Sequence, residues 1–147
     1  FFMSLKVQRF FELNRAERSL FIQAFLLSII YSFYILIVPK RIIFKWLGNK
    51  GVESSFEPIS ETLSEIFQVE KSIRRAVRYL PWKTKCFAQA ISAKRLLQQK
   101  NISSTIYLGV AKKEKDRMIA HAWLRCGNRI VTGKEEMKNF TPVLYFS

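Results

Sequence analysis

The chain has 147 residues, 49% of them hydrophobic, and 25 Lys and Arg against 11 Asp and Glu give a formal net charge of +14. This length fits one domain, or one domain with an appendage, and the apolar content excludes a disordered chain. Two cysteines and one histidine are too few for a disulfide-stapled scaffold or for a zinc site built from Cys and His. Any Cys and His chemistry therefore depends on Cys86, Cys126 and His121.

Residues 20–38 carry no charged side chain over 19 positions. They predict a helix whose length reaches the lower range of a membrane-spanning segment, about 17–25 residues. Gln23, Ser28 and Ser32 make it less apolar than a typical anchor, and basic residues flank both ends. A helix packed on the rest of the protein is favoured, while a helix on a membrane surface and a membrane span stay open as alternatives.

A Gly-Asn-Lys-Gly segment at residues 48–51 is the clearest break in the chain. It predicts an N-terminal helical region over residues 1–50 and a second domain over residues 51–147.

Two helices are predicted after this break. Apolar residues spaced close to 3.6 positions indicate a helix that opens at Ser60 and is ended by Pro81. The next helix starts at Thr84, its expected N-cap, and runs to about residue 100. Strands are expected beyond it, with Gly127-Asn128 as a two-residue hairpin turn: they cover residues 104–111, 119–126, 129–132 and 140–146. Helices followed by antiparallel strands predict an α+β fold.

Cys86 lies in the first turn of the second helix, where unpaired N–H groups and the helix dipole favour an anion. Lys83 and Lys85 act in the same direction, so the position favours a thiolate nucleophile. His121 lies in a His-Ala-Trp segment of an apolar strand. An inert core cysteine and a buried core histidine are the alternatives. A helix-start Cys followed by a strand His is, however, the order found in papain-like and transglutaminase-like enzymes.

The group that would orient His121 stays open. A two-residue turn would place Lys134 opposite His121, and no acid stands there. Glu135 and Glu136 follow directly, and Asn128 lies at the far end of the hairpin. A bulge that brings Glu135 to the histidine and a dyad without a third member both fit the sequence. The other cysteine, at the end of its strand, is expected to be structural.

The segment LPWKTKCFAQA at residues 80–90 resembles the nucleophile segment of the lasso-peptide leader peptidases, which are transglutaminase-like cysteine peptidases of ribosomal peptide biosynthesis. The segments YLGVA (107–111) and AHAWLR (120–125) are also similar to that family, and residues 15–48 resemble its helical lead-in. The resemblance implies a papain/transglutaminase-like core with an N-terminal helical appendage. It also implies Cys86 as nucleophile, His121 as general base and acid, and neither a cofactor nor a metal. The family pattern has an Asp near residue 134, where this chain reads Thr-Gly-Lys.

The same resemblance implies removal of the leader from a lasso-peptide precursor. It suggests a stand-alone peptidase in the cytoplasm. A separate leader-recognition protein and the lasso cyclase would be its partners. Contact with a membrane surface through residues 20–38 stays open. Eleven Lys and Arg and no acid between Lys71 and Lys113 motivate one alternative without catalysis, a nucleic-acid-binding module. The apolar residues 20–38 motivate another, a membrane-associated accessory protein that this helix would anchor. No nucleic-acid-binding motif accompanies this basic run, so no nucleic-acid partner is expected.

Overall fold

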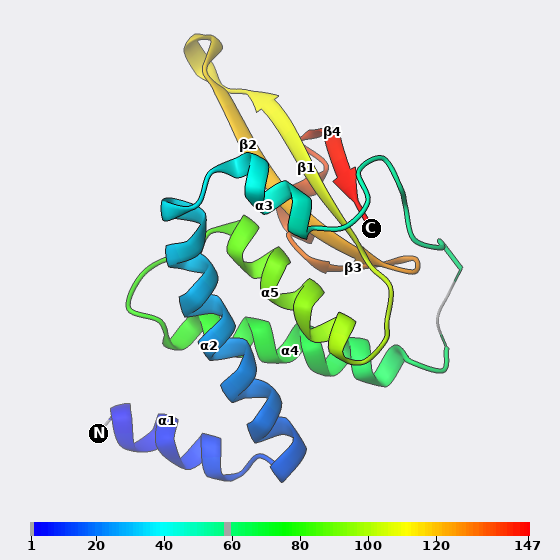
Figure 1. Ribbon diagram of the computed structural model, residues 1–147. Coiled ribbons are helices and arrows are strands. Elements are labelled where there is room, and N and C mark those ends of the chain that lie inside the picture. Colours follow the sequence, from blue (N-terminus) through cyan, green and yellow to red (C-terminus); the bar gives the residue numbers. More distant parts are fainter. Residues whose placement is uncertain (1, 58–59) are drawn as a thin grey trace.

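The computed structural model describes residues 2–57 and 60–147. Its helices and antiparallel sheet confirm the predicted α+β class (Figure 1). The helices are α1 (Phe2–Phe11), α2 (Arg15–Ile37), α3 (Lys40–Trp46), α4 (Leu63–Tyr79), α5 (Cys86–Gln99) and the short α6 (Lys134–Met137). The strands are β1 (Thr105–Lys112), β2 (Met118–Cys126), β3 (Arg129–Thr132) and β4 (Thr141–Phe146).

The strands form one antiparallel sheet in the order β3-β2-β1-β4. Each expected strand is present and agrees with its expected ends to within one residue. Gly127 and Asn128 form the two-residue turn between β2 and β3, as the sequence predicts. Gly109 of β1 lies opposite His121 of β2. His121 lies on an inner strand of the sheet, because β2 has β3 on one side and β1 on the other.

A register shift between β2 and β3 shows that the expected position of Lys134, opposite His121, is wrong. Next to the turn the strand partners are those expected, but a bulge then places Leu124 opposite Thr132. The strand ends there, because Gly133 adopts a left-handed backbone conformation with φ of 75°. Lys134 is consequently the first residue of α6 rather than a strand residue.

Two helix starts also differ from the prediction. α4 begins at Leu63 rather than at Ser60. Thr84 is not the N-cap of α5, since Lys85 holds that position and makes no side-chain capping bond. The Thr84 hydroxyl is buried and has no hydrogen-bond partner in the described part of the chain, so it caps nothing.

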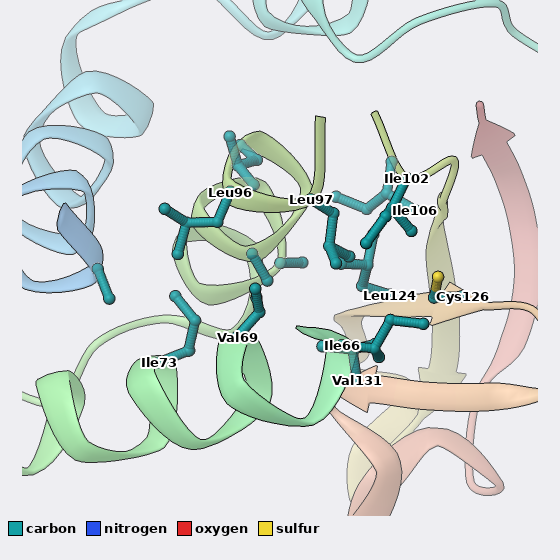
Figure 2. Packing of buried hydrophobic residues seen from close by; sticks show 14 of the residues in the cluster. Ile66, Val69, Ile73, Leu96, Leu97, Ile102, Ile106, Leu124, Cys126 and Val131 are labelled. Atoms are coloured by element: carbon teal, nitrogen blue, oxygen red, sulfur yellow. The ribbon is translucent and has the colours of Figure 1, made fainter. Parts of the chain in front are cut away.

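Helices α4 and α5 lie against one face of the sheet, and α2 packs on both of them along one side of the molecule (Figure 1). Figure 2 shows the core where side chains of α4 and α5 meet those of the strands, among them Val69, Leu97 and Leu124. Leu20 of α2 and Ile43 of α3 belong to the same buried cluster. Residues on both sides of the expected boundary after residue 50 thus share one core, and the division into two domains stays a prediction.

Helix α2 is stabilised at its start by a capping box. The Asn14 side-chain oxygen accepts from the N–H of Glu17 at 2.8 Å, and the Glu17 carboxylate accepts from the N–H of Asn14 at 3.3 Å. Small side chains on one face, Ala24 and Ser28, let α2 approach the neighbouring helices closely. By length and composition alone this helix could cross a membrane, although only 17% of its most apolar stretch is buried in the protein.

Candidate active site

Cys86 is the first residue of α5, so its thiol lies at the positive end of the helix dipole. The thiol is half-buried and forms no disulfide. Because Lys85 supplies no capping side chain, the first-turn N–H groups have no side-chain acceptor there. Such N–H groups can stabilise an anion that forms next to the cysteine.

His121 is buried on β2, and its ring is held by the main chain. Its Nε2 lies 3.0 Å from the carbonyl oxygen of Gly133. A carbonyl oxygen only accepts, so Nε2 carries the proton and donates it. In the neutral ring Nδ1 is then the free acceptor. The rings of Phe140 and Trp123 lie beside the imidazole, with centroids 5.0 and 6.0 Å from it, and restrict its rotation.

Gly133 is required at its position for two reasons. Its φ of 75° is one that other residues rarely adopt. A Cβ at this position would lie 2.6 Å from the carbonyl oxygen of Ala122 and 2.9 Å from Nε2 of His121. Sequence reasoning missed Gly133 as a site residue, because the group it contributes is a backbone carbonyl. The available signal was a glycine directly after a strand.

Of the acids considered for the third position, the structure brings Glu136 to the histidine. Its carboxylate oxygen Oε2 lies 3.7 Å from Nδ1 of His121, close enough for an ion pair when the ring is protonated. The Glu136 side chain is exposed, so water weakens this attraction. Glu135 lines the same cavity but forms no ion pair or hydrogen bond with the ring in the described part of the chain, and Asn128 is an exposed residue of the hairpin turn.

A cavity of about 1040 Å³ joins these groups. Cys86 and His121 both line it, although no hydrogen bond connects them in the described structure. Catalytic hydrogen bonds are often long before a substrate binds. The buried hydroxyls of Thr84 and Thr132 also line this cavity, and neither has a hydrogen-bond partner among the described residues. Both hydroxyls are enclosed by protein atoms, which is a costly arrangement for a polar group without a partner.

The cavity carries more positive than negative side chains. Glu70 is already paired, because its carboxylate binds Arg74 at 3.0 Å and Arg129 at 2.8 Å. Lys83 is exposed at the cavity wall, as are three further lysines: Lys40, Lys85 and Lys134. Glu135 and Glu136, the other two acids of the lining, take no part in these ion pairs with Arg74 and Arg129. The site therefore favours a ligand with negative charge.

Cys126 lies apart from this cavity lining. Its side chain is buried, its Sγ donates to the carbonyl oxygen of Ser103 at 3.3 Å, and burial raises the pKa of its thiol. A protonated thiol in an apolar core is a poor nucleophile. In the described residues no group of three or more His, Cys, Asp and Glu is placed to hold a metal ion.

Comparison with known proteins gives one match. A family model described as the transglutaminase-like superfamily matches residues 36–145. The match includes the helix that begins at Cys86 and the whole sheet apart from Phe146, the last residue of β4. No curated protein and no solved structure matches the chain.

Proposed function

This chain belongs to the transglutaminase-like superfamily, and we propose that it is a cysteine peptidase that removes the leader peptide from a lasso-peptide precursor. One observation carries the proposal: a helix-start thiol and an imidazole oriented through its Nε2 line a single cavity. Enzymes of this superfamily are commonly cysteine peptidases or acyl transferases. The assignment to leader removal is supported by the resemblance of the segments around Cys86 and His121 to the leader peptidases.

In the first step, His121 takes the thiol proton of Cys86 on Nδ1. The Sγ attacks the carbonyl carbon of the scissile peptide bond, and the oxyanion that forms is stabilised by N–H groups at the start of α5. The proton on Nδ1 then passes to the leaving amine, the C–N bond breaks, and a Cys86 thioester remains. Throughout, the Gly133 carbonyl keeps Nε2 as the donor, so Nδ1 alone carries the moving proton.

In the second step, water hydrolyses the thioester. His121 accepts a proton from the attacking water and returns it to the departing Cys86 sulfur, which regenerates the thiol. While the ring is protonated, the Glu136 carboxylate near Nδ1 stabilises its charge. Besides the water that is consumed, both steps use side chains and main-chain groups of this chain.

The proposed partners follow from the substrate. The precursor peptide would be presented by a separate leader-recognition protein, and the freed core peptide would pass to the lasso cyclase. A cytoplasmic location fits this sequence of events. The positive cavity wall favours a precursor segment or partner surface that carries acidic residues.

The test is incubation of the protein with a precursor peptide and the recognition protein, read by mass spectrometry. Wild type should yield separate leader and core fragments, whereas Cys86→Ala should yield none and keep its circular dichroism spectrum. Cys126→Ser is the matched control and should keep most activity. His121→Ala should slow turnover by about 100-fold or more. Cleavage by a folded Cys86→Ala variant, or its loss in a folded Cys126→Ser variant, would contradict the assignment.

A further inference from the structure

One face of α2 is apolar and is left uncovered by the described part of the chain. Its side chains follow each other at three- or four-residue spacing over about four turns. They are between 46% and 78% exposed: Ile22, Leu26, Ile30, Phe33 and Ile37. We call these five residues the α2 stripe. Exposed apolar residues are common one at a time, but a continuous row of them marks an interaction surface.

One tryptophan extends the apolar surface beyond the α2 stripe, and a second is exposed on α3. The ring of Trp82 lies against Phe33 with centroids 5.7 Å apart, and its Nε1 donates to the hydroxyl of Ser32 at 3.4 Å. Trp46, at the end of α3, is 77% exposed. Tryptophan suits a boundary between apolar and aqueous surroundings, because its ring is apolar and its N–H is polar.

Basic residues stand at both ends of the α2 stripe. Over residues 15–46 there are five Lys and Arg and a single acid, Glu17. Arg15 begins α2, and Lys40 and Arg41 begin α3. This arrangement is complementary to an anionic surface. It also disfavours a second copy as the occupant, because each copy carries a formal net charge of +14.

We propose that the α2 stripe docks on the surface of an anionic lipid bilayer, with α2 parallel to the membrane plane. The five side chains carry no hydrogen-bonding group, whereas a specific protein interface usually contains about one hydrogen bond per 100–200 Å². An apolar row flanked by Lys and Arg is the pattern of helices that lie in the membrane interface. The stripe would enter the acyl boundary while the basic residues bind phosphate groups.

Docking parallel to the surface follows from the other face of α2. Ala24 and Ser28 are completely buried in the protein, and α2 packs on α4 and α5. A membrane span would have to withdraw both residues from these contacts and open the core. The C-terminal end of α2 also contributes Ile35 to the candidate active-site cavity. Docking would therefore hold that cavity close to the membrane, independently of whether the protein is a peptidase.

Sedimentation with vesicles tests the proposal without any peptidase substrate. The full chain should bind vesicles that contain phosphatidylglycerol, bind pure phosphatidylcholine vesicles more weakly, and be released from the anionic vesicles as salt rises. Leu26→Glu should reduce the partition coefficient by about tenfold or more, the scale set by burial of one leucine. Val143→Glu is the matched control and should bind as wild type, because Val143 is similarly exposed but lies on the edge strand β4.

Any of four results would overturn the proposal. One is failure of the folded wild type to bind anionic vesicles. Another is a Leu26→Glu variant that binds them as well as Val143→Glu does. The third, from sedimentation velocity without lipid, is a dimer that Leu26→Glu alone dissociates. Alkaline carbonate should release the bound protein, because it docks at the surface; protein that resists carbonate would establish a span instead.

Discussion

The carbonyl oxygen of Gly133 lies 3.0 Å from Nε2 of His121, so a main-chain group orients the imidazole, a role for which the sequence left Glu135, Asn128 or no third residue open. The carbonyl fixes the same tautomer that a carboxylate would fix, since both only accept. It carries only a dipole, so the charge that balances a protonated ring must come from elsewhere. Glu136 is the acid that the structure places within 4 Å of that ring.

Gly133→Ala should reduce cleavage by tenfold or more, because the new methyl carbon would lie only 2.9 Å from Nε2 of His121 and would displace the ring. Gly51→Ala is the matched control: φ is 77° at Gly51 and 75° at Gly133, but no atom lies within 4 Å of a Cβ at residue 51. Gly51→Ala should lose about 1–2 kcal/mol of unfolding free energy from the positive φ. Gly133→Ala should lose more, because its Cβ would also lie 2.6 Å from the carbonyl oxygen of Ala122. Urea unfolding and a cleavage assay separate the two effects. Equal activity of the two variants would contradict the role of Gly133.

Glu136→Gln should lower kcat/KM for cleavage by about two- to fivefold, the scale of an exposed ion pair. The carboxylate lies 3.7 Å from Nδ1 of His121, where it stabilises the protonated ring between proton transfers. Glu135→Gln, one residue away and also on the cavity wall, is the control and should leave kcat/KM unchanged. A larger loss in Glu135→Gln than in Glu136→Gln would reverse the assignment. Thermal unfolding of both variants checks that the fold is kept.

The strands and the hairpin could be predicted because their signals are local. Short apolar segments and the Gly127-Asn128 pair indicate where β2 and β3 lie, whatever packs on them. A bulge in this hairpin was open from the sequence, but its place was not. The pairing of Leu124 with Thr132 depends on how the chain at Gly133 meets Ala122 and the histidine in three dimensions.

The site was only partly accessible from the sequence for a related reason. Cys86 has a side chain whose chemistry shows in the sequence, and the helix start beside it is a local pattern. The acceptor for His121 is a backbone carbonyl. Every residue has one, so the residue types in the sequence do not show which carbonyl accepts this hydrogen bond. Thr84 was expected as a cap from its side chain alone, but tertiary packing buries that hydroxyl at the cavity instead.

Lys94 predicts a measurable pH dependence of stability. Its Nζ is buried and donates to the carbonyl oxygen of Ser104 at 2.7 Å, and burial lowers its pKa to about 8. Between that value and the pKa of about 10.4 in the unfolded chain, the unfolded state binds more protons, so stability rises with pH. From pH 7 to pH 9 the gain should be about 1 kcal/mol in urea unfolding.

The matched pair for this measurement is Lys94→Met against Lys112→Met, because Lys112 is exposed on the sheet. Lys94→Met should lose the rise between pH 7 and pH 9, whereas Lys112→Met should keep it. The comparison between variants cancels the titration of other groups. A rise of the same size in both would show that Lys94 does not cause it.

The lysines on the cavity wall predict that cleavage depends on salt. Lys83 is an exposed residue of the nucleophile segment and lines the cavity, whereas Lys112 lies at the end of β1 and is absent from the lining. Attraction of an acidic precursor or partner to such charges is screened over about 10 Å at 0.1 M salt. Rising salt should therefore lower kcat/KM more than kcat, because steering acts on association and not on the bond-breaking step.

Lys83→Glu should show the loss already at low salt and respond little to added salt, while Lys112→Glu should follow wild type. Steady-state kinetics at two salt concentrations decide the question. If all three proteins show the same flat salt dependence, the lysines at the cavity serve solubility and do not capture substrate.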